Sequence, residues 1–186
     1  MDENIKKQLT EYHFPRWNEL PDFDLYMDQV VYYVDQQLRP LYFNDEKIIT
    51  SSMVNNYVKN SIVKAPEKKR YSRKHIAYLI IICLFKKSFT LTEITKFIEI
   101  QVSMKQSNLM EAYNSFAEVF DKALNKKINT HYLVQEERDT PHKLLMDSVI
   151  QTLVCKIYTE YAVLDEIFNN KYKISLMTIS DILIIS

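Results

Sequence analysis

The sequence predicts a mainly α-helical protein, and three observations support this fold class. Several segments carry apolar residues at intervals of three or four, which is the spacing of one helix face. The 186 residues include no glycine, which disfavours tight hairpins, phosphate-binding loops and nucleophile elbows. Hydrophobic residues make up 47% of the chain and charged residues 26%, so we expect a packed core rather than disorder.

The first predicted elements are an N-terminal arm and a helix. Residues 1–21 are polar, and we expect the arm to pack onto the body through its ring-bearing residues His13, Phe14 and Trp17. Residues 24–38 carry apolar side chains at helical spacing, with aspartates mainly on the other side. Arg39-Pro40 ends this helix, because a residue before proline avoids helical geometry.

A short amphipathic helix is predicted over residues 51–60, with Thr50 as its N-cap. At about 100° per residue, its apolar residues Met53, Val54, Tyr57 and Val58 share one side. The opposite side carries Ser52, Asn55, Asn56 and Lys59. The following segment, 62–71, contains a proline and many cations but no helical repeat, so we expect a loop or a small β wing.

The rest of the chain predicts four further helices. They are residues 73–87, capped by Ser72; 91–102, opened by the capping-box pattern Thr90-Leu91-Thr92-Glu93; 108–126; and 141–169, with Thr140 as cap and Pro141 at the first position. We expect a polar loop over 127–139. Residues 174–185 are strongly apolar, and their pattern fits either a short helix or a strand.

Charge is distributed unevenly along a chain whose formal net charge is zero. Residues 47–87 contain ten Lys or Arg and a single acid, Glu67. Residues 1–46 contain four bases and ten acids, and residues 88–186 contain ten bases and thirteen acids. A local basic segment beside a short amphipathic helix is typical of a surface that binds a polyanion.

The 51–60 helix has the composition of a helix that reads the DNA major groove. Such a helix needs small or amide-bearing residues outward and an apolar back. Asparagine can bind adenine through two hydrogen bonds, and nearby cations contact phosphates. An ordinary solvated helix is the alternative, and the flanking cations favour DNA. The candidate DNA-binding residues are Ser52, Asn55, Asn56, Lys59, Lys64, Lys68, Lys69, Arg70, Arg73 and Lys74.

The order of these features resembles the winged-helix DNA-binding domain of the MerR family. The residues that carry the resemblance are Val54-Asn55-Asn56-Tyr57, Ala65-Pro66, Lys69-Arg70-Tyr71, the apolar run 76–84 and Phe89-Thr90-Leu91-Thr92-Glu93-Ile94. The resemblance implies that Arg70 and Tyr71 are the DNA-contacting Arg-Tyr pair of a wing, which adds Tyr71 to the candidate set. The chain departs from the family pattern in having Asn56 where an arginine is usual, no wing glycine and no long coiled coil directly after the domain.

A second resemblance is to an uncharacterised bacterial family, the domain of unknown function 1836. Leu25-Tyr26-Met27-Asp28-Gln29-Val30, residues 50–59 and Lys69-Arg70-Tyr71-Ser72 are similar to its signature stretches. This resemblance covers roughly residues 20–125 and implies a MerR-like DNA-binding fold.

Enzymatic chemistry is not expected. The four histidines, His13, His75, His131 and His142, are scattered without the spacing of metal ligands. Cys83 and Cys155 lie in apolar helical patterns, so we expect reduced, buried thiols and no metal or other cofactor. The N-terminus lacks the apolar core of a signal peptide, and the longest apolar run, 80–85, is too short to span a bilayer. We expect a cytoplasmic protein.

The sequence therefore predicts a DNA-binding transcriptional regulator in three parts: an arm (1–21), a MerR-like winged helix-turn-helix (22–105) and a helical C-terminal region (106–186) that dimerises or binds a small-molecule effector. The expected partner is double-stranded DNA, bound by a homodimer. The expected dimer contacts, all on the 141–169 helix, are Val149, Leu153, Ile157, Leu164 and Phe168. The alternatives are an adaptor whose basic segment is covered by an acidic partner or by its own acidic N-terminal region, and an RNA-binding protein that uses the same face.

Overall fold

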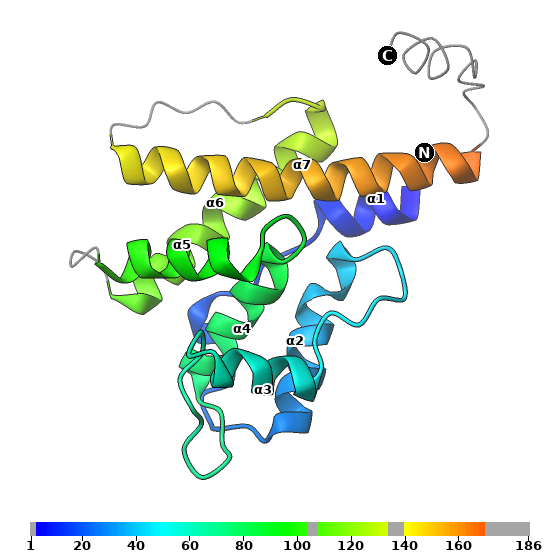
Figure 1. Ribbon diagram of the computed structural model, residues 1–186. Coiled ribbons are helices and arrows are strands. Elements are labelled where there is room, and N and C mark those ends of the chain that lie inside the picture. Colours follow the sequence, from blue (N-terminus) through cyan, green and yellow to red (C-terminus); the bar gives the residue numbers. More distant parts are fainter. Residues whose placement is uncertain (1–2, 104–107, 134–139, 170–186) are drawn as a thin grey trace, which may run out of the picture.

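The computed structural model describes residues 3–103, 108–133 and 140–169. Within them the prediction of a mainly helical fold is confirmed, because they contain seven α-helices and two short 3-10 helices but no strand (Figure 1). The α-helices are α1 (Glu3–Thr10), α2 (Met27–Leu38), α3 (Ser51–Lys59), α4 (Arg73–Phe85), α5 (Leu91–Ser103), α6 (Leu109–Thr130) and α7 (Pro141–Asn169). The 3-10 helices are η1 (Trp17–Glu19) and η2 (Arg39–Leu41).

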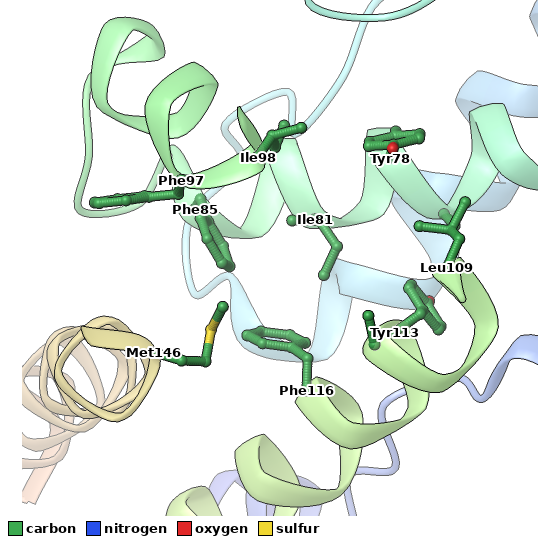
Figure 2. Close-up of a pocket in the computed structure, with 11 residues that line it drawn as sticks. Tyr78, Ile81, Phe85, Phe97, Ile98, Leu109, Tyr113, Phe116 and Met146 are labelled. Atoms are coloured by element: carbon green, nitrogen blue, oxygen red, sulfur yellow. The ribbon is translucent and has the colours of Figure 1, made fainter. Parts of the chain in front are cut away.

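Helix α4 lies at the centre of the fold. Its sequence is apolar on all sides, and eight of its thirteen residues are buried, which is typical of a helix surrounded by other elements. Helix α2 packs against α4, and α6 packs against α7. One continuous core joins these helices, from Leu9 in α1 to Tyr161 in α7. An apolar pocket remains among α4, α5, α6 and α7 (Figure 2).

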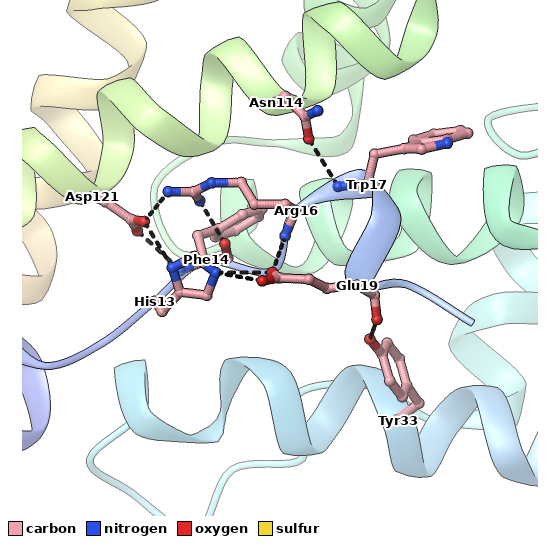
Figure 3. Close-up of polar contacts among 8 residues, drawn as sticks. All are labelled: His13, Phe14, Arg16, Trp17, Glu19, Tyr33, Asn114 and Asp121. Carbon is pink, nitrogen blue, oxygen red and sulfur yellow. Dashed lines mark hydrogen bonds and ion pairs between the residues drawn. The ribbon is translucent and has the colours of Figure 1, made fainter. Parts of the chain in front are cut away.

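The N-terminal arm packs onto α6, and Phe14 is its anchor. The Phe14 side chain is fully buried, and its ring lies 5.5 Å from Phe116 and 5.6 Å from Phe120 between centroids. The Phe14 backbone N–H donates to Asp121 Oδ1 at 3.0 Å, and Arg16 Nη2 pairs with Asp121 Oδ2 at 2.6 Å (Figure 3). The expectation that the arm packs onto the body is confirmed, and the arm also contains α1, which the sequence did not predict.

Side chains at the helix starts act largely as the sequence predicts. Thr50 Oγ1 accepts a hydrogen bond from Met53 N–H at 3.2 Å at the start of α3. Before α5, Thr90 and Glu93 form the predicted capping box: Thr90 N–H donates to Glu93 Oε2 at 2.8 Å, and Glu93 N–H donates to Thr90 Oγ1 at 3.3 Å. The Glu93 carboxylate accepts hydrogen bonds from the Thr90 N–H and the Thr90 hydroxyl, and these lower the pKa of Glu93. Ser72 precedes α4, where its N–H donates to His75 Nδ1 at 3.0 Å.

Several helix boundaries differ from the predictions. Helix α2 begins at Met27 rather than at residue 24, and α6 continues to Thr130, so the loop expected from residue 127 starts later. Segment 62–71 contains only the antiparallel bridges Leu25–Tyr71 and Glu67–Arg70, so within the described chain it is a loop, not a strand pair. Residues 134–139 of the expected loop and the apolar segment 174–185 lie outside the described residues.

Helix α7 buries its apolar side within its own chain. Val149, Leu153 and Ile157 are at most 4% exposed and belong to the continuous core, where α7 packs on α6. These residues therefore cannot supply the dimer contacts expected of them. Leu164 is partly buried, and the side chain of Phe168 lies outside the described set.

The described part of the chain contains no helix long and apolar enough to cross a membrane. It also contains no group of three or more His, Cys, Asp or Glu side chains placed to hold a metal ion. Both cysteines are free thiols. Cys83 is buried, which raises the pKa of its thiol to about 12, and Cys155 is only partly buried.

Candidate nucleic-acid interface

Helix α3 is anchored by one side and exposes the other. Val54 and Tyr57 are 0% and 1% exposed, and Met53 and Val58 are partly buried against the core. The residues on the opposite side are all exposed: Ser52, Asn55, Asn56 and Lys59. The division that the sequence predicts for this helix is therefore present in the fold.

The two asparagines on the exposed side differ in their hydrogen bonding. Asn60 Nδ2 donates to Asn56 Oδ1 at 2.9 Å and to the Asn56 backbone oxygen at 2.8 Å. This leaves the Asn56 amide nitrogen as its outward donor. Asn55, in contrast, makes no side-chain hydrogen bond within the described residues, so both its donor and its acceptor are available to a ligand.

After α3 the chain makes a tight turn, and its backbone forms hydrogen bonds back to the last turn of the helix. Ser61 has a φ of 58°, and the N–H groups of Ile62 and Val63 both donate to the Tyr57 backbone oxygen, at 2.9 and 3.2 Å. Val63 is buried and fixes the start of the segment that follows. We call residues 64–70 the basic loop.

The tip of the basic loop is a turn with two left-handed lysines. Lys68 and Lys69 have φ values of 48° and 64°, and Arg70 N–H donates to the Glu67 backbone oxygen at 2.8 Å. Two successive positive φ angles are typical of the hairpin turns that usually contain glycine. A lysine in this conformation is strained by about 1–2 kcal/mol. The turn holds both lysines exposed at the end of the loop.

The base of the basic loop is tied to the segment before α2. Tyr71 N–H donates to the Leu25 oxygen at 2.8 Å, and Leu25 N–H donates to the Tyr71 oxygen at 2.9 Å. Tyr71 is only 3% exposed, and its ring contacts His75 edge-on at 5.6 Å. This corrects the expectation for Tyr71, which is a buried support of the loop and does not lie on the exposed surface. Arg73 is partly buried, and its Nε donates to the Pro21 oxygen at 3.2 Å.

Arg70 is exposed, and its side chain contacts Tyr26, which is not among the candidate residues predicted from the sequence. The guanidinium carbon of Arg70 lies 4.5 Å from the centroid of the Tyr26 ring. Arg70 Nη2 also donates to Tyr26 Oη at 2.8 Å. Tyr26 belongs to a stretch that resembles a family signature, but nothing in the sequence indicates its contact with a residue 44 positions away.

The exposed cations of this surface are not neutralised within the described chain. Lys59, Lys64, Lys68, Lys69 and Lys74 are exposed and form no ion pair there. Figure 1 places α3 and the basic loop at the end of the molecule away from α1 and α7. We call this surface, formed by the exposed side of α3, the basic loop and the start of α4, the basic face.

Several acids of the N-terminal region have partners elsewhere. Glu19 pairs with His13 at 2.8 Å and accepts the Arg16 backbone N–H at 2.6 Å. Asp35 pairs with Arg39. Helix α1 contacts α6 and η2. Glu19 and Asp35 are therefore engaged by residues other than the cations of the basic face.

A family model described as a domain of unknown function, DUF1836, matches residues 15–116. The match is longer than half of the chain, and it extends from the arm into α6. All candidate residues of the basic face lie inside it. No curated protein and no solved structure matches the chain.

Proposed function

The chain belongs to the DUF1836 family, and we propose that it binds duplex DNA as a transcriptional regulator. The observation that carries the proposal is the exposed side of α3. There Asn55 presents an amide without an internal partner, beside cations that form no ion pair in the described chain. In this interpretation, α2, α3, the basic loop and α4 form a MerR-like winged helix-turn-helix.

The size and anchoring of α3 suit a recognition helix. A helix of nine residues is about 14 Å long, and with side chains it is about 10–12 Å wide, close to the width of the major groove. The buried Val54 and Tyr57 keep the helix on the body while its other side enters the groove. Asn55 then faces base edges, and its amide can pair with adenine through two hydrogen bonds.

The cations of the basic face would contact phosphates. Lys68 and Lys69 occupy the loop tip, Lys64 lies at its start and Lys74 lies in the first turn of α4. Arg70 presents a guanidinium already oriented by Tyr26, and a guanidinium can form paired hydrogen bonds with a phosphate. Phosphate contacts of this kind supply most of the affinity of DNA-binding proteins and position the helix that reads bases.

The alternative functions have less support. An adaptor whose own acidic region covers the basic face is disfavoured, because the exposed lysines of that face form no ion pair within the described chain. Duplex RNA is disfavoured because its deep, narrow major groove does not admit a helix. A cytoplasmic homodimer on paired half-sites remains part of the proposal, with contacts other than the buried Val149, Leu153 and Ile157.

The proposal is tested by the salt dependence of binding to duplex DNA. If about four cations reach phosphates, the slope of log affinity against log salt is about −3 to −4. Lys68→Ala is expected to shallow the slope by about one. Lys126→Ala, an exposed lysine of α6 outside the basic face, serves as the matched control and leaves the slope unchanged. A flat salt dependence, or no binding to duplex DNA at low salt, would contradict the proposal. Tighter binding to single-stranded RNA than to duplex DNA would favour the RNA alternative.

A further inference from the structure

A pocket between four helices is separate from the basic face. Side chains of α4, α5, α6 and α7 surround it, and Figure 2 shows them around an open centre. Ile81 and Phe85 come from α4, Phe97 from α5, Phe116 from α6 and Met146 from α7. The pocket is therefore built by four helices that follow one another in the sequence.

The chemistry of the wall selects against charged ligands. No charged side chain and no histidine lines the pocket, and the polar groups of its side chains are limited to the hydroxyls of Tyr78 and Tyr113. A charged molecule would lose its hydration there without a compensating partner. Ordered water would also find few hydrogen bonds, because a buried water needs two to four polar partners.

Much of the wall is formed by aromatic side chains that hold one another. Phe85 lies 5.5 Å from Phe116 and 6.3 Å from Phe97 between ring centroids, and Phe97 lies 5.2 Å from Phe89. Such contacts restrict the rings, so the aromatic side of the pocket is formed before any ligand binds. Met146, which Figure 2 shows beside Phe85 and Phe116, adds an unbranched side chain that can adapt to a ligand.

The size of the pocket limits the ligand to a small molecule. Its volume is about 100 Å³, somewhat less than an engineered apolar cavity of about 150 Å³ that binds benzene. Side chains around an empty apolar space lack contact partners on one side, so a ligand that fills the space gains those contacts. We propose that this pocket binds an uncharged, apolar small molecule of about the size of one ring.

The inference does not depend on DNA binding and can be tested without DNA. Trp17, the single tryptophan of the chain, contacts Tyr113 edge-on at 6.1 Å, and Tyr113 lines the pocket. Fluorescence of Trp17 therefore reports occupation of the pocket. Toluene is a suitable uncharged probe, and benzoate carries the same ring with a negative charge.

The experiment measures melting temperature and Trp17 fluorescence of the full chain with each probe. Toluene at about ten times its dissociation constant is expected to raise the melting temperature by roughly 3–6 °C, whereas benzoate has no effect. Two variants fill the pocket from different helices, Ala112→Leu in α6 and Met146→Phe in α7. Each is expected to weaken toluene binding at least about tenfold, so either one suffices if the other fails to fold.

The matched control is Ala162→Leu, which adds the same side chain to α7 at a partly buried position outside the pocket. This variant is expected to bind toluene as the unmodified chain does. The inference is overturned if toluene changes neither the melting temperature nor the fluorescence. It is also overturned if benzoate binds equally well, or if both filled variants retain full affinity for toluene.

Discussion

Arg70 lies against Tyr26, with its guanidinium carbon 4.5 Å from the centroid of the tyrosine ring and its Nη2 donating to Tyr26 Oη at 2.8 Å. The pair joins the basic loop to the residue that precedes α2. A long arginine side chain normally loses much rotational freedom when it binds a ligand. Tyr26 restricts Arg70 in advance, so the loop offers an oriented guanidinium with further N–H donors still available.

Tyr26 should therefore affect DNA binding without touching a base. Tyr26→Phe keeps the ring but removes the hydrogen bond, and we expect affinity for any duplex to fall by about 0.5–1.5 kcal/mol. Tyr26→Ala removes both contacts and should cost about 1–2 kcal/mol. Fluorescence anisotropy with random duplexes measures both effects. Tyr32→Phe, at an exposed tyrosine within α2, is the control. Unchanged affinity in both Tyr26 variants would mean that Arg70 does not contact phosphate.

The left-handed conformation of Lys69 allows the effect of its charge on DNA binding to be separated from the effect of its backbone strain on stability. Lys69→Gly relieves a strain of about 1–2 kcal/mol and adds about 0.5–1 kcal/mol of chain entropy to the unfolded state. We therefore expect the free energy of unfolding to rise by about 0.5–1 kcal/mol while affinity for DNA falls. Denaturant unfolding and anisotropy measure the two quantities. Lys74→Ala removes a charge from the same face without this backbone effect, so it should weaken binding and leave stability nearly unchanged. If Lys69→Gly is less stable than the unmodified chain, Lys69 does not have a strained left-handed backbone.

Lys87 and Glu160 form a buried ion pair with unequal partners. Lys87 Nζ lies 2.7 Å from Glu160 Oε2 and 3.8 Å from the centroid of the Tyr42 ring, and the Lys87 side chain is 4% exposed. Burial lowers the pKa of Lys87, although Glu160 opposes the shift. Glu160 is 30% exposed and also pairs with Lys156 at 3.2 Å.

Removing Glu160 should therefore lower the free energy of unfolding more than removing Lys87. Glu160→Ala leaves a buried ammonium without its carboxylate, and we expect a loss of about 3 kcal/mol in the free energy of unfolding. Lys87→Met leaves Glu160 with Lys156 and solvent, so we expect a loss below about 1 kcal/mol. Denaturant unfolding of both variants tests the difference. Equal losses of unfolding free energy in the two variants would contradict this difference between Lys87 and Glu160.

The arm should loosen in acid because of Glu19. The hydrogen bond from Arg16 N–H lowers the pKa of Glu19 below its ordinary value, and His13 contributes in the same direction. A carboxylate with a lowered folded-state pKa stabilises the fold above its unfolded-state pKa, and this stabilisation is lost as the pH falls through the folded-state value. We expect Trp17 fluorescence to report release of the arm below about pH 4. Glu19→Gln should show a weaker arm already at pH 7 and a smaller change in acid, whereas Asp28→Asn should behave as the unmodified chain does. If Glu19→Gln shows the same acid transition as the unmodified chain, the transition arises from groups other than Glu19.

The sequence predicts α3 well because its information is local. The apolar spacing of Val54, Tyr57 and Val58 and the cap at Thr50 depend on residues within one helix. The exposed set of Ser52, Asn55, Asn56 and Lys59 follows from the same periodicity. Helix α1 was missed because it has only two apolar residues, Ile5 and Leu9, and depends on packing against α6.

The basic loop shows where local patterns stop being informative. A loop has no periodicity that separates inside from outside, so Tyr71 was assigned to the surface together with Arg70. Its burial follows from backbone pairing with Leu25, a residue 46 positions earlier. The left-handed conformation of Lys68 and Lys69 was equally hidden, because lysine disfavours it and the glycine that signals such turns is absent.

The most direct test of the central claim is the affinity of Asn55→Ala for two kinds of DNA. Fragments selected from a random duplex pool supply the preferred site, and an unselected duplex is the reference. If α3 reads bases, Asn55→Ala costs about 1–3 kcal/mol on the preferred site and little on the reference, whereas Arg70→Ala weakens both alike. The melting temperature of Asn55→Ala should stay unchanged, because its side chain is exposed and has no partner within the described residues. Equal loss on both duplexes, or no loss on either, would contradict base reading by this helix.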